Sequence, residues 1–356
     1  MNRAGLPAIK LYVSSEVGMT GFPEFWLHNT SRSLLLLPAS WVYRVAMASR
    51  RLGYRCGILR RERIAVPVLV IGNIFVGGTG KTPLVLWLVR YLRSMGRRPG
   101  VITRGYGGQA KEWPQVVNAD SDPYEVGDEP VLLAQRGGCP VVASPDRVQA
   151  AQALVDTYGC DVVVSDDGLQ HYRLHRDLEV VVIDAARGLG NGNCLPAGPL
   201  REPRSRLRQV DLLVANGGPS WLTPYYFTLR VNRAVSVTDS ERWVNLKEFA
   251  GEPAHAIAGI GNPDRFFAAL GRFGIDVIRH PFADHYPFSH KDVNFDDGFP
   301  VLMTEKDAVK CKACAGDRHW AVPAETVLTA ETERALKARV RSTLERFAKA
   351  EKKQKQ

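Results

Sequence analysis

The sequence lacks the marks of a disulfide-bonded secreted protein. The six cysteines show no framework spacing and we see no secretion signal, so we expect reduced thiols in the cytoplasm. Cys311 and Cys314 form a single CxxC pair, and no second pair follows to complete a zinc site. A composition of 45% hydrophobic and 24% charged residues is typical of a soluble globular protein. The length of 356 residues predicts about two domains.

Acidic residues are almost missing between Arg32 and Arg63. This segment has one acid, Glu62, and eight arginines, at positions 32, 44, 50, 51, 55, 60, 61 and 63. Its longest apolar stretch is about half of the ~20 residues that a membrane span needs. An amphipathic helix on an anionic membrane surface fits this pattern, and so does a helix packed on the core with its arginines in water. No nucleic-acid-binding module is recognisable, so we expect no nucleic-acid partner.

The most informative segment runs from Val66 to Pro83. An apolar, β-branched run leads into a glycine cluster and then into Lys-Thr, with a helix expected from Pro83. In this arrangement the loop N–H groups bind phosphate, the lysine reaches the terminal phosphates and the threonine hydroxyl binds Mg²⁺. Phe75 stands where the standard P-loop pattern has its first glycine. The predicted nucleotide-binding residues are Val76, Gly77, Gly78, Thr79, Gly80, Lys81, Thr82 and Pro83.

Alternating strands and helices follow this loop, which predicts an α/β fold with a parallel sheet and ligands at the carboxyl ends of its strands. We expect strands at 100–103, 140–143, 161–166, 179–184 and 210–215, and helices at 82–94, 129–136 and 146–158. The predicted organisation is an N-terminal extension and basic segment (1–60), a P-loop α/β/α domain (61–221) and a linker (222–251). A smaller α/β domain (252–325) and a C-terminal helix with a basic tail (326–356) follow. Met19 resembles a natural start, with residues 1–18 as an extension.

Several other segments place polar side chains at the ends of predicted elements. Asp166 and Asp167 end a buried strand, as a carboxylate that organises Mg²⁺ would. Asp184 also ends a strand, and fits either a metal-site acid or a helix cap. Asp128 opens a helix and could be its N-cap, while the turn at Tyr106 could approach a ligand. The Arg201-Glu202 pair could be a salt-bridged turn, and His285 lies in a polar loop of the second domain.

Taken in order, these motifs resemble one family. They are Gly-Asn-Ile-Phe-Val-Gly-Gly-Thr-Gly-Lys-Thr-Pro, Thr-Arg-Gly-Tyr-Gly, Gly-Asp-Glu-Pro, Asp-Asp-Gly-Leu-Gln-His, Leu-Pro-Ala-Gly-Pro-Leu-Arg-Glu-Pro, Asp-His-Tyr and Thr-Glu-Lys-Asp. The set is similar to that of the tetraacyldisaccharide 4′-kinases, the lipid A 4′-kinases of Gram-negative bacteria, from about Phe22 to Val322.

The resemblance implies that the γ-phosphate of ATP passes to the 4′-hydroxyl of a tetraacylated glucosamine disaccharide 1-phosphate, at the cytoplasmic face of the inner membrane. It implies two α/β/α domains around a cleft, and a peripheral attachment through the arginine-rich segment. Lys81 is then catalytic, as is the Asp128–His285 dyad that activates the acceptor hydroxyl. Thr82, Glu129 and Gln170 are implied at the metal, and Tyr106, Asp166, Asp167, His171, Arg201 and Glu202 around the same site. No obligate protein partner is implied.

Two other functions remain open at this point. A regulatory P-loop NTPase of the metallochaperone or targeting kind also uses a Gly-Gly-x-Gly-Lys-Thr loop. That class often has a second lysine before the glycine pair, where this chain has Val76. A membrane- or nucleic-acid-binding protein with an incidental glycine loop would bind no ATP. Transfer of labelled phosphate from ATP to lipid separates the three.

Overall fold

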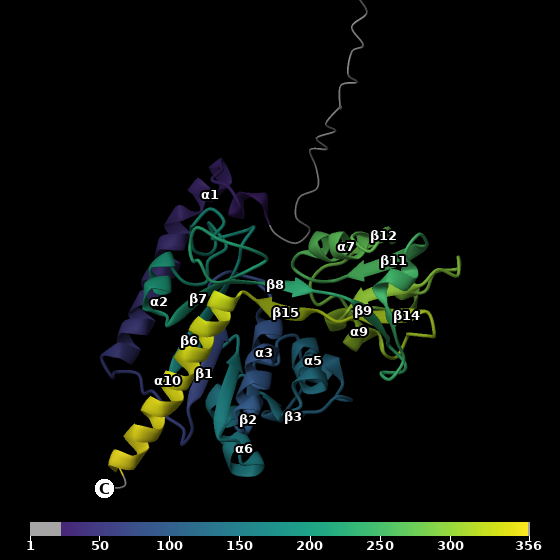
Figure 1. Ribbon diagram of the computed structural model, residues 1–356. Helices are drawn as coiled ribbons and strands as arrows, with labels where there is room; N and C mark the ends of the chain where they lie inside the picture. The colour runs from purple at the N-terminus through teal and green to yellow at the C-terminus, as the bar shows by residue number, and fades with distance from the viewer. Residues whose placement is uncertain (1–22, 355–356) are drawn as a thin grey trace, which may run out of the picture.

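Two α/β units lie side by side in the computed structural model, which describes residues 23–354 (Figure 1). The first unit contains a nine-stranded sheet in the order β15-β8-β7-β6-β1-β5-β2-β4-β3. Its strands are β1 (Val68–Gly72), β2 (Pro99–Thr103), β3 (Gln115–Val117), β4 (Val141–Ala143), β5 (Val162–Asp166), β6 (Leu178–Asp184), β7 (Leu212–Asn216), β8 (Tyr226–Arg230) and β15 (Glu325–Leu328). Only the edge strands β3 and β15 pair antiparallel.

Helices cover both faces of this sheet and give three layers. On one face, α3 (Lys81–Ser94), α5 (Asp128–Gly137) and α10 (Ala330–Gln354) contribute to a core with Leu69, Val164 and Val182. On the other face, α6 (Arg147–Tyr158) packs on Val70 and Val163. The short helices α4 (Pro123–Val126) and η2 (Arg204–Gln209) lie in connections. The carboxyl ends of the parallel strands therefore meet at one edge of the sheet, beside β1.

The second unit contains a six-stranded sheet in the order β10-β9-β14-β13-β11-β12. Its elements are β9 (Arg233–Ser236), β10 (Trp243–Asn245), η3 (Leu246–Phe249), β11 (Pro253–Ala258), α7 (Pro263–Gly271), β12 (Asp276–Pro281), α8 (His290–Val293), β13 (Val301–Thr304), α9 (Glu305–Cys311) and β14 (His319–Val322). Phe266, Phe267 and Leu270 of α7 pack on the sheet in a separate core. The chain enters this unit after β8 and leaves it before β15.

The sequence predicts most of these elements to within a few residues and misses the short ones. Residues 222–251, expected as a linker, contain β8 of the first sheet and β9 and β10 of the second. These strands are only partly buried, so they show no sustained apolar period. The helix expected from Pro83 begins at Lys81, which makes Pro83 its third residue. Pro83 remains in the first turn, where N–H groups have no intrahelical partner.

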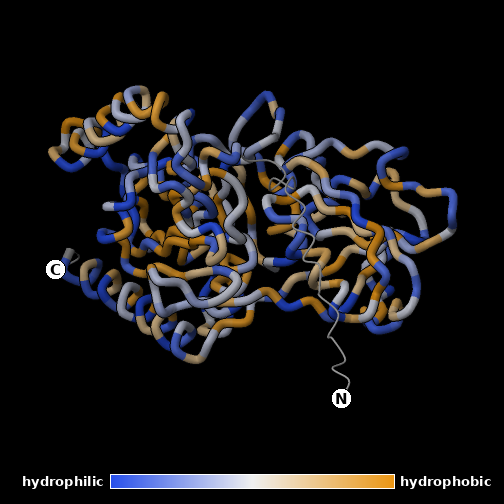
Figure 2. Tube along the Cα trace, turned by 90° about the horizontal axis from the view of Figure 1, so that it is seen from above, coloured by the Kyte–Doolittle hydropathy of each residue, from blue (hydrophilic) through white to orange (hydrophobic). Residues whose placement is uncertain are grey.

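The arginine-rich segment forms α1 (Ser31–Leu35) and α2 (Leu37–Arg55), after a short helix η1 (Glu24–Trp26). Only Ser40 and Gly53 of α2 are buried, and the Ser40 hydroxyl donates to the carbonyl of Cys194 at 2.8 Å. Trp41 and Val42 are 61% and 71% exposed. Apolar and polar residues alternate along this projecting helix at the upper left of Figure 2. Among the helices of residues 23–354, none is long and apolar enough to cross a membrane. The extension predicted at residues 1–18 lies outside the described residues.

Candidate active site

The loop between β1 and α3 is held by amide side chains from two strand ends. Buried Asn73, just after β1, donates to the Gly77 carbonyl at 3.2 Å and to the Thr79 hydroxyl at 3.0 Å. Asn216, the last residue of β7, donates to the Thr79 carbonyl at 3.0 Å. Gly80 has φ +76°, and a Cβ there would lie 2.1 Å from the Asn216 amide nitrogen. The tight loop therefore needs glycine at this position for both conformation and space.

Two acids at the end of β5 contact the two residues that begin α3. Lys81 Nζ lies 3.5 Å from Asp167 Oδ1, and the Thr82 hydroxyl lies 3.5 Å from Asp166 Oδ2. Arg201 donates to both oxygens of Asp167, at 3.0 and 2.8 Å. Burial would raise the pKa of Asp167, but the charges of Lys81 and Arg201 hold it well below its usual range. Asp167 thus stays ionised and fixes the lysine at the mouth of the loop.

Asp166 is in the opposite electrostatic situation. It is 1% exposed, and burial followed by repulsion from Glu129 raises its pKa to about 7. Its Oδ1 has no hydrogen-bond partner among the described residues. A buried carboxylate oxygen without a partner, beside a threonine hydroxyl, matches the donor set of a hard cation. No cluster of three or more His, Cys, Asp or Glu side chains suited to a metal occurs in residues 23–354. A nucleotide-bound Mg²⁺ does not need one, because phosphates and water complete its shell.

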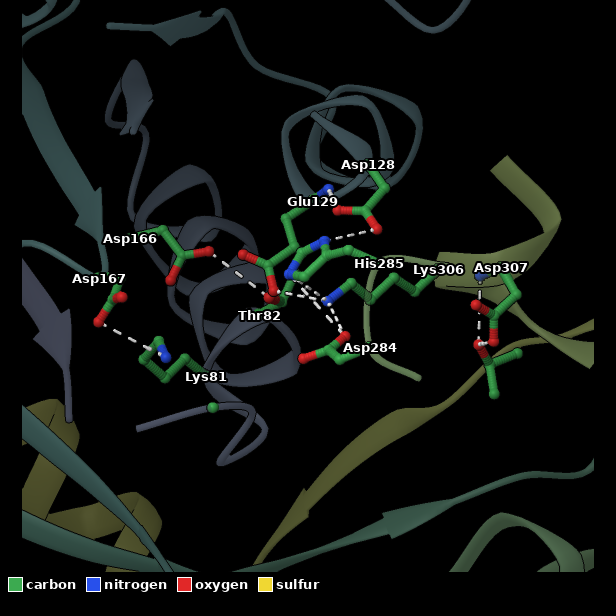
Figure 3. A network of polar contacts seen from close by, with 12 residues as sticks. Lys81, Thr82, Asp128, Glu129, Asp166, Asp167, Asp284, His285, Lys306 and Asp307 are labelled. Carbon is green, nitrogen blue, oxygen red and sulfur yellow. Dashed lines mark hydrogen bonds and ion pairs between the residues drawn. The ribbon is translucent and has the colours of Figure 1, made fainter. Parts of the chain in front are cut away.

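The two units meet at Asp128 and His285, which Figure 3 shows from close by. Asp128 is the first residue of α5; Gly127 occupies the N-cap, so the cap reading of Asp128 is wrong. Its Oδ1 accepts from the Glu129 N–H at 2.8 Å, and its Oδ2 lies 3.0 Å from His285 Nδ1. His285 has φ +61°, an unusual backbone for a residue with a side chain. Tyr106 lies with its ring centroid 5.1 Å from that of His285.

Lys306, in the first turn of α9, contacts the other side of the imidazole. Its Nζ lies 3.4 Å from His285 Nε2, 2.8 Å from Asp284 Oδ1 and 3.1 Å from Glu129 Oε1 (Figure 3). Burial would lower the pKa of Lys306, but the carboxylates of Glu129, Asp128 and Asp284 raise it. The lysine is therefore a permanent cation that joins Glu129 of the first unit to Asp284 and His285 of the second.

A cavity of about 230 Å³ opens between the two units. Its polar side is lined by Gly78, Thr79, Gly80, Lys81, Thr82, Pro83, Glu129, Arg265, Asp284 and Lys306. Its apolar side is lined by Leu229, Val231, Ile260, Phe266, Ala269 and Val322. Glu129 and Asp284 are the sequence neighbours of Asp128 and His285. The glycine loop thus shares this cavity with the neighbours of the Asp–His pair.

Known proteins resemble this chain over most of its length. The family model for tetraacyldisaccharide-1-phosphate 4′-kinase matches residues 32–343. The chain belongs to this family. The tetraacyldisaccharide 4′-kinase of Alkalilimnicola ehrlichii is 53% identical over 331 residues, which cover 92% of this chain and 98% of the relative. That of Nitrosococcus oceani is 49% identical, over 92% of this chain and 95% of the relative. A crystal structure of LpxK from Aquifex aeolicus in complex with ATP shares 28% identity and a TM-score of 0.73, over 88% of this chain and 99% of that chain.

Family membership confirms the resemblance inferred from the motifs. Tetraacyldisaccharide 4′-kinases are phosphotransferases with a hydroxyl acceptor, so the kinase function in lipid A biosynthesis is confirmed as well. The mixed α/β architecture with parallel sheets is shared with the Aquifex protein.

Other motif residues of the kinase form a second polar group beside the first. The Gln170 amide donates to the Asn73 carbonyl at 2.9 Å and to Glu202 Oε1 at 3.3 Å. Glu202 is fully buried and also accepts from the Tyr172 hydroxyl. Burial, with the charge of Arg147, lowers the pKa of His171 to about 4, so this imidazole is neutral. This group supports the residues that hold Lys81, through Arg201 and Asn73.

Sequence reasoning missed five side chains of this site, among them Asn73, Asn216 and Lys306. The two asparagines follow apolar strands, which is a usable signal because strand ends of a parallel sheet converge. Lys306 belongs to the recognised Thr-Glu-Lys-Asp motif, but a lysine near a helix start is normally solvated, so no role in the site was inferred for it. Arg187 and Arg265 were missed too; Arg187 donates to the Gly78 carbonyl, and Arg265 lies 3.1 Å from Asp184 Oδ2.

We expect Lys306→Met to lower kcat by about 100-fold, because a displaced reacting pair can cost that much. The change keeps the length of the side chain and removes only the cation between Glu129 and Asp284. Lys312→Met is the matched control: Lys312 also bridges the units, 2.7 Å from Asp120, but both side chains are mainly exposed. Exposed pairs contribute little, so the control should retain its rate. Equal rates for both variants in steady-state lipid kinase assays would contradict this role.

Proposed function

We propose that this chain transfers the γ-phosphate of ATP to the 4′-hydroxyl of a tetraacylated glucosamine disaccharide 1-phosphate. One observation carries the proposal: the glycine loop shares a cavity with Glu129, Asp284 and Lys306, which lie beside the Asp128–His285 pair that joins the two units. Such a cavity can hold donor and acceptor in line and exclude water, which would otherwise take the phosphoryl group. The ATP in the Aquifex crystal structure supports the same donor here.

The phosphates of ATP are proposed to lie on the N–H groups of residues 76–82, with Lys81 on the terminal phosphates. The apolar side of the cavity, including Val231 and Phe266, is the part suited to the nucleobase. Thr82 and Asp166 are the residues best arranged to hold Mg²⁺, which when bound neutralises phosphate charge. Glu129 and Gln170, implied by the family resemblance, remain predictions. Glu129 Oε1 accepts from Lys306, so its Oε2 is the oxygen proposed for the metal.

The acceptor hydroxyl is proposed to lose its proton to the Asp128–His285 pair. Both Asp128 oxygens already have partners, so we propose that His285 Nε2 takes the proton, with Asp128 to orient and stabilise the resulting cation. Lys306 lies 3.4 Å from Nε2, its longest contact here, and would keep only its bonds to Asp284 and Glu129 during this step. Burial lowers the pKa of His285, but the hydrogen bond and charge of Asp128 outweigh it and raise the pKa above 6.5. Burial opposes ionisation of Asp128, yet the His285 hydrogen bond and Lys306 lower its pKa.

We therefore expect kcat/KM to fall on the acidic side through a pKa above 6.5, because protonated His285 cannot take a proton. An acidic limb below pH 4 would assign the base role to Asp128 alone. Asp166 also titrates near pH 7, so activity alone does not separate the two groups. An NMR titration of the His285 imidazole does: its pKa should drop in Asp128→Asn, where the raising interaction is lost.

We also propose that α1 and α2 attach the chain to the cytoplasmic face of the bacterial inner membrane as a peripheral protein. Leu35, Trp41, Val42 and Val45 are 61% or more exposed, which is unusual for four apolar residues within eleven. The Tyr43 hydroxyl donates to the Arg201 carbonyl at 2.8 Å, so the helix adjoins the site. An acylated acceptor then needs to move only its sugar head from the bilayer to the cavity.

The test is transfer of label from [γ-³²P]ATP to the purified tetraacyl disaccharide 1-phosphate in mixed micelles. A labelled lipid product that depends on both substrates is expected. Release of labelled inorganic phosphate without any lipid product would instead favour the regulatory NTPase. Absence of ATP binding would exclude both the lipid kinase and the regulatory NTPase.

A further inference from the structure

A second cavity, of about 310 Å³, lies between the C-terminal part of α2 and the nucleotide-binding unit. Five of its lining residues are Arg51, Arg55, Arg61, Arg176 and Arg206, and we call it the arginine pocket. It shares no lining residue with the cavity that contains Lys81. None of these arginines belongs to the catalytic arrangement proposed above.

The floor of the arginine pocket places two arginines against two acids. Arg176 and Arg206 both donate to one oxygen, Glu179 Oε1, at 3.0 and 2.5 Å. Arg206 Nε lies a further 3.6 Å from Glu202 Oε2, an acid that already accepts from Tyr172. Side chains of both arginines are nearly buried, at 12% and 4% exposure. Arg176 also donates to the Leu169 and His171 carbonyls, both at 2.7 Å, so the floor is nearly balanced in charge and the rim decides the net charge of the pocket.

The rim adds three arginines and no acid that pairs with them. Arg51 donates to the Gln209 side-chain oxygen at 2.5 Å, a neutral partner. Arg55 and Arg61 are exposed, and neither has an ion pair within residues 23–354. The other lining acid, Asp211, accepts from the Glu179 N–H at 2.8 Å. Five arginines therefore face two carboxylates around one cavity, which favours an anion with several acceptor oxygens.

Exposed apolar residues interspersed in sequence with the rim arginines indicate what carries that anion. Leu52 lies between Arg51 and Arg55 in sequence, and Ile58 lies between Arg55 and Arg61. They are 59% and 81% exposed. A phosphate next to two exposed aliphatic side chains is the chemistry of a phospholipid at the bilayer interface.

We propose that the arginine pocket binds the phosphate of an anionic phospholipid head group, with Leu52 and Ile58 against its acyl chains. The proposal rests on the membrane attachment proposed above and adds one defined lipid site to it. This lipid is neither donor nor acceptor in the kinase reaction. Its site orients the first unit on the bilayer with α2 between membrane and protein.

The experiment compares two double variants of the full chain that remove the same charge from the same segment. Arg55→Gln with Arg61→Gln changes the pocket rim, and Arg32→Gln with Arg60→Gln changes exposed arginines outside it. Binding is measured by co-sedimentation with phosphatidylcholine vesicles that contain or lack phosphatidylglycerol. All four positions are exposed, so equal thermal unfolding midpoints and equal ATP affinity confirm that the variants fold.

The pocket variant should bind phosphatidylglycerol vesicles about tenfold more weakly than the control variant, the loss expected for one charge-assisted hydrogen bond. On pure phosphatidylcholine the two should bind alike. If both variants lose vesicle binding equally on phosphatidylglycerol, the pocket is not a lipid site. The binding would then come from general attraction between arginines and the anionic membrane. No vesicle binding by the unmodified chain would instead overturn the membrane attachment itself. Stabilisation by inorganic phosphate that the pocket variant alone loses, without a vesicle difference, would mark a soluble-phosphate site and overturn the lipid assignment.

Discussion

Replacing Asp128 with Asn is expected to lower kcat by about 100- to 10,000-fold, the usual contribution of a positioned acid–base group. The amide keeps the shape of the side chain and can still accept the Glu129 N–H. It carries no charge to stabilise a His285 imidazolium, and its nitrogen cannot accept from Nδ1–H. The hydroxyl of the acceptor then keeps its proton until phosphoryl transfer is far advanced. Initial rates of labelled lipid formation at saturating ATP measure the effect.

The control for Asp128 is Asp120→Asn. Asp120 also forms an ion pair across the two units, with Lys312, but its side chain is 85% exposed. Removal of that charge should change the rate by less than about twofold, as for other exposed pairs. ATP affinity should be unchanged in both variants. If the Asp128→Asn protein keeps its full rate, the Asp128–His285 pair does not act as the base.

Replacing Lys81 with Ala is expected to lower kcat/KM for ATP by about 100- to 1,000-fold, the usual loss when one positioned donor to a developing anion is removed. The Lys81 side chain is 10% exposed, and its Nζ lies 3.5 Å from Asp167 Oδ1. Without it, the Asp167 carboxylate would face the phosphates and repel them. The loss should therefore appear in ATP binding as well as in kcat, unlike the loss in Asp128→Asn.

Lys247→Ala serves as the control for Lys81, because Lys247 is an exposed residue of η3 in the second unit. Fluorescent ATP analogues give the dissociation constants directly. If Lys81→Ala binds ATP as tightly as the control does, the phosphates lie elsewhere in the cavity. The double variant Lys81→Ala with Asp167→Asn should recover part of the ATP affinity, because it removes the repelling carboxylate.

The parts of the fold that could be predicted are those with strong local patterns. Strands β5 and β6 are buried along their whole length, and their valine runs end in acids, so both were found. Strands β9, β10 and β15 are short and half-exposed, and their pairing depends on residues far away in the chain. No local pattern could predict that 222–251 contributes to two sheets.

The site was predicted residue by residue from motifs, and its geometry was not. Asp128 and His285 are 157 positions apart, so their pairing was predicted from the family resemblance and not from spacing, and the 3.0 Å contact is a finding of the structure. Lys306 is the clearest residue missing from the predicted site. Its role follows from its contacts with Glu129, Asp284 and His285, which only the structure shows. Gln170 shows the converse: its motif was recognised, and its hydrogen bonds to Asn73 and Glu202 could not have been.

The insertion of the second unit between β8 and β15 has a consequence for biosynthesis on the ribosome. Strand β8 is complete at Arg230, but its antiparallel neighbour β15 begins at Glu325. The whole second unit must emerge before that sheet edge is covered. The core residues Leu336, Val340 and Leu344 of α10 arrive later still. The nucleotide-binding unit, although encoded first, is therefore the last to be completed, and the nascent chain exposes an open strand edge and an uncovered apolar patch until synthesis is almost finished.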